Sequence, residues 1–200
     1  NVYGLKYLPS FVNSHQTSAD YLEVIGRSIN VDRGSGNGQF TNRDYLIALR
    51  EFKKIRHIVK CIVEIGVATN FEMSSTHLWL SWKKNFTHYF GIDLIMDKKK
   101  HHEDWKPNVH MLECNSNDDR DLIVNNMISF GCKEIDILFI DGDHSYTSVK
   151  LDWEEYSDYV RKGGIIGFHD MALLDNPLVD VHRLWGELTD AGSPLGTMTS

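Results

Sequence analysis

Two short runs in the second half of the chain contain the residue types that could do chemistry. The first is FIDGDHSY at residues 139–146, and the second is GGIIGFHD at residues 163–170. In each run apolar residues end abruptly in acidic residues and histidine, a pattern typical of buried parallel strands that end in polar groups. Ligand sites of open α/β sheets lie at the carboxyl ends of the strands, so we expect a reactive cluster there.

Asp141 and Asp170 are the acidic residues that we expect to lie closest together. They end strands that should be neighbours, about 4.8 Å apart. Two carboxylates at this range repel each other unless a proton or a cation lies between them. A hard divalent ion such as Mg2+ binds one or two carboxylates together with water and substrate oxygens, so the pair predicts a metal site. The alternative is a structural carboxylate pair without a metal ion.

His144 lies three residues after Asp141, in the turn that follows the strand. A neutral imidazole near pH 7 can take a proton from a hydroxyl group that a metal ion has already acidified. His144 is therefore a candidate general base. The alternative is that it only caps the helix that begins at Ser145.

The elements that must position these residues alternate between strands and helices. Strands alternating with helices of 10–15 residues predict an α/β fold with a doubly wound, mostly parallel sheet, helices on both faces and right-handed crossovers. The expected strands cover residues 58–65, 88–94, 109–114, 135–140 and 165–168. The expected helices cover residues 41–57, 74–84, 118–130 and 146–161.

Two of these helices have apolar residues at helical spacing, which predicts the face that each one buries. In the segment 118–130, the inward residues would be Leu122, Ile123, Met127 and Phe130. In the segment 146–161, one stripe would combine Val149, Trp153, Tyr156 and Val160. Residues 162–164 (KGG) would end this second helix, because glycine is common just past a helix C-terminus.

The first strand ends in VEIGVATN at residues 63–70, a turn into a helix. Gly66 and Ala68 would let backbone N–H groups approach a ligand closely. The G-x-G-x-x-G pattern of dinucleotide-binding folds is absent, and Glu64 suits a ligand with an ammonium or sulfonium group better than a pyrophosphate. Asp93 ends the second strand, where a carboxylate can hold both hydroxyl groups of a ribose.

These motifs together resemble those of the class I S-adenosylmethionine-dependent methyltransferases. The matching pieces are the EIG turn, GID at residues 91–93, IDGDHSY at residues 140–146 and KGGIIGFHD at residues 162–170. Within this class, the chain is most similar to small metal-assisted O-methyltransferases that act on sugar hydroxyl groups of antibiotics, the macrocin O-methyltransferase and cephalosporin-hydroxylase-like group. The resemblance covers about residues 58–171 and implies the Rossmann-like methyltransferase fold.

The resemblance assigns S-adenosylmethionine as the cofactor and implies a binding residue at each strand end. These residues are Glu64, Gly66 and Ala68 at the methionine end, Asp93 at the ribose, Asn115 and Ser116 on the adenine side, and Asp141. Two of these positions depart from the family pattern. Asn70 replaces the usual second glycine of the first turn, and Asn115 stands where the family often has Asp.

The resemblance also implies that Asp141, His169 and Asp170 bind the metal ion, Mg2+ or Mn2+, and that His144 is the general base. Position 169 is commonly acidic in better-known members of the family, so His169 is a departure. An imidazole at this position would suit Mn2+, Fe2+ or Zn2+ better than Mg2+. The alternative is that His169 does not bind the metal ion.

The expected reaction is in-line transfer of a methyl group from S-adenosylmethionine to a hydroxyl oxygen of a small-molecule acceptor. The metal ion would hold this oxygen, His144 would remove its proton, and no covalent enzyme intermediate is needed. One alternative is a metal-dependent hydrolase of a nucleotide-type substrate. Another is a methyltransferase-like module that binds ligands without turnover.

Composition and charge restrict the partners and the location. The net charge of −7 argues against a nucleic-acid partner, because phosphate binding needs a clustered basic surface. No apolar run approaches the ~20 residues of a membrane span, so we expect no membrane partner. The three cysteines lack CxxC spacing and favour a reduced, cytoplasmic compartment.

Domain boundaries follow from the same patterns. Residues 1–40 would form an N-terminal extension or cap, with the glycine-rich break at residues 34–38 as a hinge. Residues 41–200 would form the S-adenosylmethionine-binding methyltransferase domain. The segment after residue 178 looks too short for the last two strands of this fold, as in a chain truncated at its C-terminus.

Overall fold

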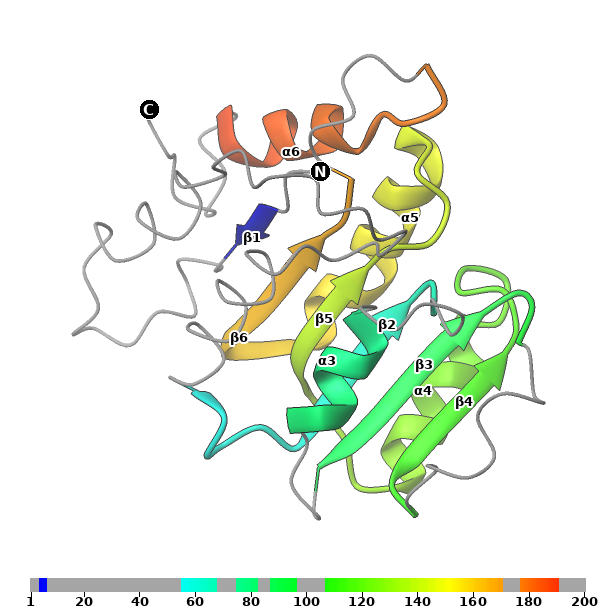
Figure 1. The fold of residues 1–200 in the computed structure, drawn as a ribbon, viewed down its shortest axis with the longest axis vertical. Coiled ribbons are helices and arrows are strands. Elements are labelled where there is room, and N and C mark those ends of the chain that lie inside the picture. The colour runs from blue at the N-terminus through cyan, green and yellow to red at the C-terminus, as the bar shows by residue number, and fades with distance from the viewer. Residues whose placement is uncertain are drawn as a thin grey trace, which may run out of the picture.

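The computed structural model describes residues 4–6, 55–67, 75–82, 87–96, 107–170 and 177–190. Within these ranges the chain forms one sheet with the strand order β1-β6-β5-β2-β3-β4 (Figure 1). Strands β2 to β6 run parallel, and β1 pairs antiparallel with β6 at one edge. The strands are β1 (Gly4–Lys6), β2 (Cys61–Ile65), β3 (His88–Asp93), β4 (Val109–Glu113), β5 (Ile135–Ile140) and β6 (Val160–Phe168).

The strand order changes direction at β2, and this change determines where a ligand site is expected. Strands β2, β3 and β4 follow one another toward one edge, whereas β5 and β6 lie on the other side of β2. In open parallel sheets, ligands bind beyond the carboxyl ends of the strands at such a switch point. The carboxyl ends of β2 and β5 therefore mark the expected site.

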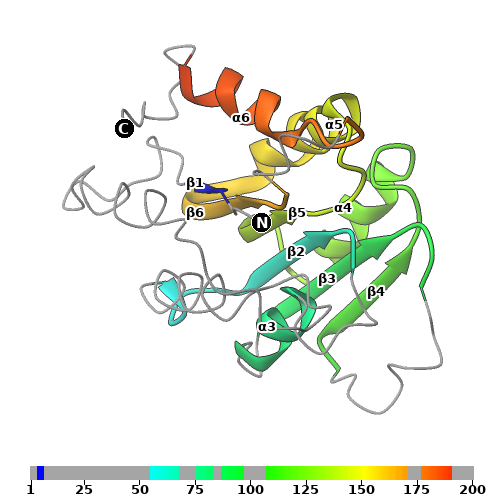
Figure 2. The ribbon, with the colours of Figure 1, turned by 45° about the horizontal axis from the view of Figure 1, so that its top comes forward.

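Helices cover both faces of the sheet, which confirms the predicted doubly wound α/β fold. Helix α3 (Ser75–Trp82) lies on one face, and α4 (Arg120–Ser129) and α5 (Tyr146–Tyr156) lie on the other (Figure 1, Figure 2). Trp79 of α3 is buried and packs edge-on against Phe139 of β5. The larger core lies on the opposite face, where α6 (Val181–Asp190) also packs; it includes Val63, Phe90, Met127, Leu138, Val149 and Leu184.

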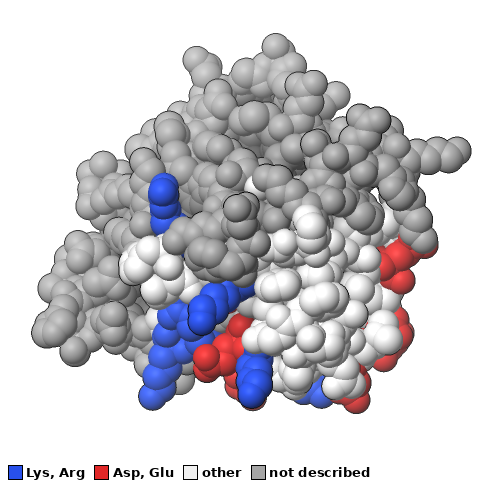
Figure 3. All heavy atoms as spheres, turned by 90° about the horizontal axis from the view of Figure 1, so that it is seen from below, with Lys and Arg blue, Asp and Glu red and all other residues white. Residues whose placement is uncertain are grey.

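A buried carboxylate joins the amino ends of three strands. Asp136 accepts hydrogen bonds from the backbone N–H groups of Lys60 (2.6 Å) and Cys61 (2.9 Å) and from Nε of Arg161. Its residue exposure is only 4%, so this charge is almost completely removed from solvent. On the surface seen from below, a group of Lys and Arg side chains adjoins Asp and Glu side chains (Figure 3).

The inward face of α4 differs in part from the prediction. Ile123 and Met127 are buried as expected, and Val124 is buried with them. Leu122 is 59% exposed and Phe130 is 45% exposed, so their predicted burial in the core is wrong. The helix ends at Ser129, and Phe130 instead packs its ring against His110 of β4, with the ring centroids 3.9 Å apart.

The predicted helix 146–161 is too long at its C-terminal end. Helix α5 ends at Tyr156, a 3-10 turn covers Ser157–Tyr159, and β6 begins at Val160. Residues 162–164 therefore lie inside a strand and do not end a helix. Val160 fits the helical stripe, but it pairs with Ile135 of β5, and this long-range pairing overrides the local helical pattern.

The other boundaries agree more closely with the sequence. Strand β5 covers the predicted residues 135–140, and the limits of β2, β3, β4, α3 and α4 lie within three residues of the expected ones, whereas β6 begins five residues earlier than expected. Residues 4–6, from the predicted N-terminal extension, form β1 and join the sheet. The hinge at residues 34–38 and all but the last residues of the helix predicted at 41–57 lie outside the described residues, and the domain division at residue 40 stays a prediction. None of the described helices is long and apolar enough to cross a membrane.

Candidate active site

The two runs that end in acidic residues and histidine lie side by side. Strands β5 and β6 pair in parallel with Ile140 opposite Phe168, so Asp141 and His169 follow at the same edge of the sheet. The backbone N–H of His169 donates a hydrogen bond to the carbonyl of Ile140 (3.0 Å). Asp170, with a φ of 52°, turns the chain sharply at this point. The prediction that Asp141 and Asp170 end neighbouring strands is confirmed.

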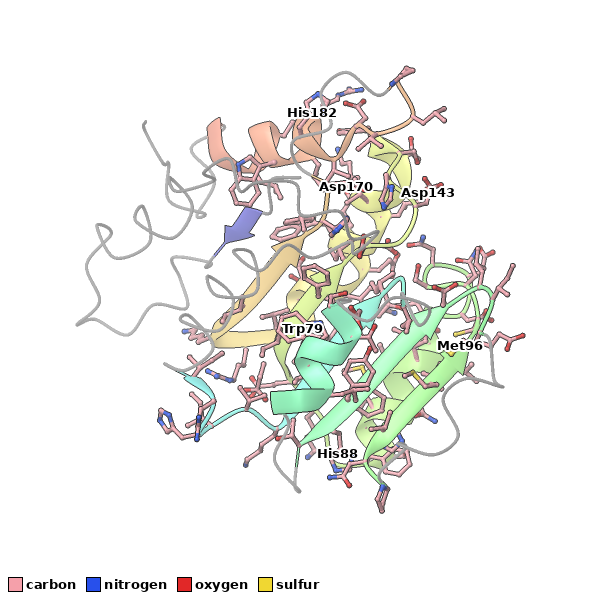
Figure 4. All side chains as sticks on the ribbon, viewed as in Figure 1. Trp79, His88, Met96, Asp143, Asp170 and His182 are labelled. Carbon is pink, nitrogen blue, oxygen red and sulfur yellow. The ribbon has the colours of Figure 1, made fainter. Side chains whose placement is uncertain are left out.

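Two imidazole rings lie between the two carboxylates. Nδ1 of His169 is 2.9 Å from Oδ1 of Asp141 and 3.1 Å from Oδ1 of Asp170. His144 contacts the same two carboxylates, with its Nε2 3.5 Å from Oδ1 of Asp141 and its Nδ1 3.4 Å from Oδ2 of Asp170. Asp141, His169 and Asp170 are buried, whereas the His144 side chain is 32% exposed. We call these four residues the carboxylate–histidine cluster; Asp170 is labelled in Figure 4.

The charges within this cluster balance one another. Burial alone would lower the pKa of His169, but contacts with Asp141 and Asp170 raise it to about 10. A contact with Asp141 is the largest cause that raises the pKa of His144. Burial would raise the pKa of Asp170, but the two histidines lower it. The contacts with the carboxylates thus favour the protonated form of each imidazole, and the imidazoles favour the ionised form of Asp170.

The donor set of the cluster can hold a metal ion. Asp141, His144 and His169 each offer one ligand atom, and these atoms lie within 4.8 Å of one another. Within the described part of the chain, no aligned hydrogen-bond donor reaches the buried Oδ1 of Asp141, although two imidazole nitrogens lie within 3.5 Å of it. A buried carboxylate oxygen such as Oδ1 of Asp141 can bind a cation. The assignment of Asp141, His169 and Asp170 as the ligands stays a prediction.

His144 does not cap the helix that follows it. The N-cap of α5 is Ser145, whose hydroxyl accepts a hydrogen bond from the backbone N–H of Ser148 (3.3 Å). Asp143 supports this cap by accepting hydrogen bonds from Ser145 N–H (2.9 Å) and Ser148 Oγ (3.0 Å); it lies beside the first turn of α5 (Figure 4). The capping alternative is therefore wrong, and the ring of His144 faces the carboxylates. The backbone carbonyl of His144 accepts a hydrogen bond from Asp180 N–H (2.9 Å), and this bond connects His144 to the residue before α6.

Gly66 allows the ends of β2 and β5 to approach each other. Its φ is +83°, and a Cβ atom at this position would lie only 2.0 Å from the carbonyl oxygen of Asp141. Its N–H donates to the carbonyl of Ile92 (2.8 Å), and the N–H of Val67 donates to Oδ2 of Asp93 (2.9 Å). The N–H groups of Gly66 and Val67 therefore donate to β3. The sequence predicts that N–H groups of this turn are open to a ligand, and this is not so for these two. Ala68 and Asn70 lie outside the described residues.

Glu64 lies in β2, two residues before Gly66, and is fully buried on the face of the sheet covered by α3. It accepts hydrogen bonds from Ser75 Oγ, from Thr76 Oγ1 (2.8 Å) and from the hydroxyl of Tyr89. Burial raises the pKa of Glu64 from 4.5 to about 7; the three hydroxyl groups lower it, and the charge of Asp141 raises it further. The sequence reasoning missed these hydroxyl partners. The role of Glu64 at the methionine end of a cofactor stays a prediction.

The remaining cofactor candidates lie at the ends of β3 and β4. Asp93 is opposite Glu113 in the register, and its Oδ1 accepts a hydrogen bond from Ile95 N–H (3.0 Å). The side-chain oxygen of Asn115 accepts from the backbone N–H groups of residues 117 (2.9 Å) and 118 (3.2 Å), which closes the turn after β4. The structure therefore brings Asp93 and Asn115 to the same edge of the sheet as Asp141, and their contacts with a cofactor stay predictions.

Asp152 of α5 is a buried acidic residue beside the candidate site, and the sequence did not predict it. It is 2% exposed and accepts a hydrogen bond from Ser116 Oγ (2.7 Å), and burial raises its pKa to about 6. A Cβ atom built on Gly142 would lie 3.6 Å from its other oxygen, so Asp152 joins the turns after β4 and β5. An acidic residue in the buried stripe of α5, between Val149 and Tyr156, is the signal that could have revealed it.

The chain matches a known protein family over the segment that forms this site. Residues 63–171 match the model of a methyltransferase domain. This match covers more than half of the 200 residues, and the protein belongs to this methyltransferase-domain family. The methyltransferase resemblance seen in the sequence motifs is thereby confirmed.

Solved methyltransferases share the fold. MycE methyltransferase from the mycinamycin biosynthetic pathway, in complex with Mg, SAH and mycinamycin VI, is 22% identical, with a TM-score of 0.50 over 66% of this chain and 36% of that chain. CalS11, a TDP-rhamnose 3'-O-methyltransferase of calicheamicin biosynthesis, is 15% identical, with a TM-score of 0.51 over 72% of this chain and 69% of that chain. The chain thus spans about a third of the length of MycE, and identities this low establish the fold alone.

A viral protein matches a shorter segment more closely. Uncharacterized protein R132 of Acanthamoeba polyphaga mimivirus is 61% identical over 36 residues. These residues are 18% of this chain and 16% of the viral protein, so the chain matches about one sixth of that relative.

Proposed function

We propose that the protein transfers a methyl group from S-adenosylmethionine to a hydroxyl oxygen of a small molecule, a sugar or a glycosylated metabolite, with the help of a divalent metal ion. The observation that carries this proposal is the carboxylate–histidine cluster at the carboxyl ends of β5 and β6. Two carboxylates and two imidazoles converge there next to the switch point of the sheet. This is where a metal-assisted methyltransferase of this fold would need groups that bind an ion and accept a proton.

The family and the solved neighbours support the choice of cofactor and acceptor class. The family is one of methyltransferases. MycE was solved with Mg and SAH, and CalS11 is named as an O-methyltransferase of TDP-rhamnose. A sugar hydroxyl as acceptor agrees with the name of CalS11, and the complex of MycE with mycinamycin VI agrees with a small-molecule acceptor.

The ends of β2, β3 and β4 would hold the cofactor, which supplies the methyl group and a sulfonium leaving group when bound. Asp93 is oriented by two backbone N–H groups and keeps lone pairs that can accept from ribose hydroxyl groups. Asn115 and Ser116 would line the adenine side. Ser116 is held by Asp152 and Tyr156, so this side of the site has little freedom to move.

His144 would take the proton of the acceptor hydroxyl. Its side chain is 32% exposed, and this opening lets an acceptor reach the ring. The carboxylates of Asp141 and Asp170 lie 3.4–3.5 Å from its two nitrogens and would stabilise the imidazolium that forms. Asp141, His169 and Asp170 would hold the divalent ion, whose charge lowers the pKa of a nearby hydroxyl group when it is bound.

Calorimetric titration with S-adenosylhomocysteine tests the cofactor, and transfer of a labelled methyl group from S-adenosylmethionine to a panel of nucleotide sugars and glycosides tests the reaction. We expect binding that weakens at least about tenfold in Asp93→Ala, because a bidentate contact to ribose is lost. We expect His144→Gln to keep this binding and lose transfer, whereas His182→Gln, on α6, keeps both.

Two results would contradict the proposal. Absence of S-adenosylhomocysteine binding with Mg2+, with Mn2+ and with EDTA would refute the methyltransferase function. Hydrolysis of a nucleotide substrate without S-adenosylmethionine would instead support a metal-dependent hydrolase.

A further inference from the structure

The side chains of the carboxylate–histidine cluster also discriminate between divalent ions, an inference that rests on the proposed metal-assisted function. We infer that the site selects a first-row transition ion such as Mn2+, Fe2+ or Co2+ over Mg2+, and that the imidazole of His169 is the residue responsible. The inference makes His169 a metal ligand, a point that the sequence leaves open.

His169 is positioned so that an ion bound by both carboxylates would also meet its imidazole. The residue is 2% exposed, and its backbone N–H is held by the carbonyl of Ile140 (3.0 Å). Its Nδ1 lies between Oδ1 of Asp141 at 2.9 Å and Oδ1 of Asp170 at 3.1 Å. No rotation of an exposed side chain is needed to bring this nitrogen into the donor set.

The two oxygen atoms lie close enough to Nδ1 of His169 to share one ion with it. Two ligand atoms about 2.1 Å from one ion and at right angles to each other are about 3.0 Å apart. Ligands of a tetrahedral Zn2+ site, with bonds of about 2.05 Å, would be about 3.3 Å apart. The separations of 2.9 and 3.1 Å around Nδ1 of His169 lie in the range of ligand atoms that share one ion, so the choice among ions rests on the types of the donor atoms.

The donor chemistry then separates Mg2+ from the transition ions. Mg2+ binds oxygen ligands and loses its water reluctantly. Imidazole nitrogen suits transition ions, whose affinity for nitrogen donors exceeds that of Mg2+. An imidazole that binds an ion has lost its proton and carries no negative charge, and a second imidazole, that of His144, shares the 4.8 Å cluster with Asp141 and His169. Each of these features weakens Mg2+ binding relative to that of Mn2+, Fe2+ and Co2+.

Calorimetric titration of the purified protein with Mn2+ and with Mg2+, in the absence of cofactor, measures this selectivity directly. We expect the Kd for Mn2+ to be at least about tenfold lower than that for Mg2+. In His169→Asp the ratio should fall by about tenfold, because a third carboxylate restores an all-oxygen donor set. His57→Asp, an exposed histidine outside the cluster, makes the same change of side chain and should leave the ratio unchanged.

Pulsed electron paramagnetic resonance of bound Mn2+ tests the ligand itself and does not depend on the folding of the His169 variant. Coupling of Mn2+ to a directly bound imidazole 14N should persist in His144→Gln, where His169 is the imidazole left in the cluster. Mg2+ binding as tight as Mn2+ binding, or no 14N coupling in His144→Gln, would overturn the inference. Either of these two results would overturn the ion selectivity without contradicting the proposed methyl transfer. Selective Mn2+ binding without S-adenosylhomocysteine binding would refute the methyl transfer and leave the ion selectivity supported.

Discussion

Glu64 is a buried carboxyl group whose ionisation we expect to reduce the stability of the fold at neutral pH. Burial raises its pKa from 4.5 to about 7, and hydroxyl groups of Ser75, Tyr89 and Thr76 only partly offset this. The folded protein therefore holds the proton more tightly than the unfolded chain does. Stability contributed by the protonated group is fully present below pH 4.5 and is lost as the pH rises to about 7.

The size of this loss follows from the pKa difference. Between pH 4.5 and 7 the unfolded chain gives up the proton and the folded protein keeps it, so each pH unit costs about 1.4 kcal/mol. The full loss is about 3 kcal/mol, which is a large fraction of the 5–15 kcal/mol that is typical of a domain. Above pH 7 both states are ionised, and the loss levels off.

Substitution of Glu64 by Gln removes the titrating group and keeps the shape of the side chain. We would measure urea denaturation of both proteins by tryptophan fluorescence at pH 4.5 to 8, with EDTA present throughout. The stability difference between Glu64→Gln and the wild type should grow in favour of the variant by about 3 kcal/mol over this range. A difference that does not change with pH would refute the reasoning, because other titrating groups are common to both proteins and cancel.

Four further substitutions test contacts elsewhere in the fold, each by urea denaturation. Gly66→Ala should destabilise the protein by about 2–4 kcal/mol, because the methyl group meets a carbonyl oxygen at 2.0 Å and φ is +83°; a loss under about 1 kcal/mol would contradict this packing. Met127→Ala should cost about 2–5 kcal/mol and Leu122→Ala less than about 0.5, and equal losses would reject the observed face of α4. Asp136→Ala should cost about 3–5 kcal/mol, since it leaves the half-buried guanidinium group of Arg161 and two backbone N–H groups without their acceptor, and a near-neutral effect would show that these contacts are dispensable.

Much of the sheet could be predicted because its signals are local. Residues 135–140 are a short apolar run with turn residues after it, and β5 has the predicted limits. The alternation of strands and helices predicts parallel neighbours, and parallel neighbours bring Asp141 and Asp170 to one edge of the sheet. The end of α5 could not be predicted in the same way, because Val160 satisfies a helical stripe and leaves it only to pair with Ile135.

The sequence by itself determined the order of the elements and the polar residues at each strand end, because apolar periodicity and abrupt changes of polarity are properties of neighbouring residues. Tertiary structure decided which of those polar residues meet. The enclosure of Glu64 by three hydroxyl groups and the position of His169 between two carboxylates depend on sheet register and helix packing. These contacts join residues far apart along the chain, so no local pattern encodes them.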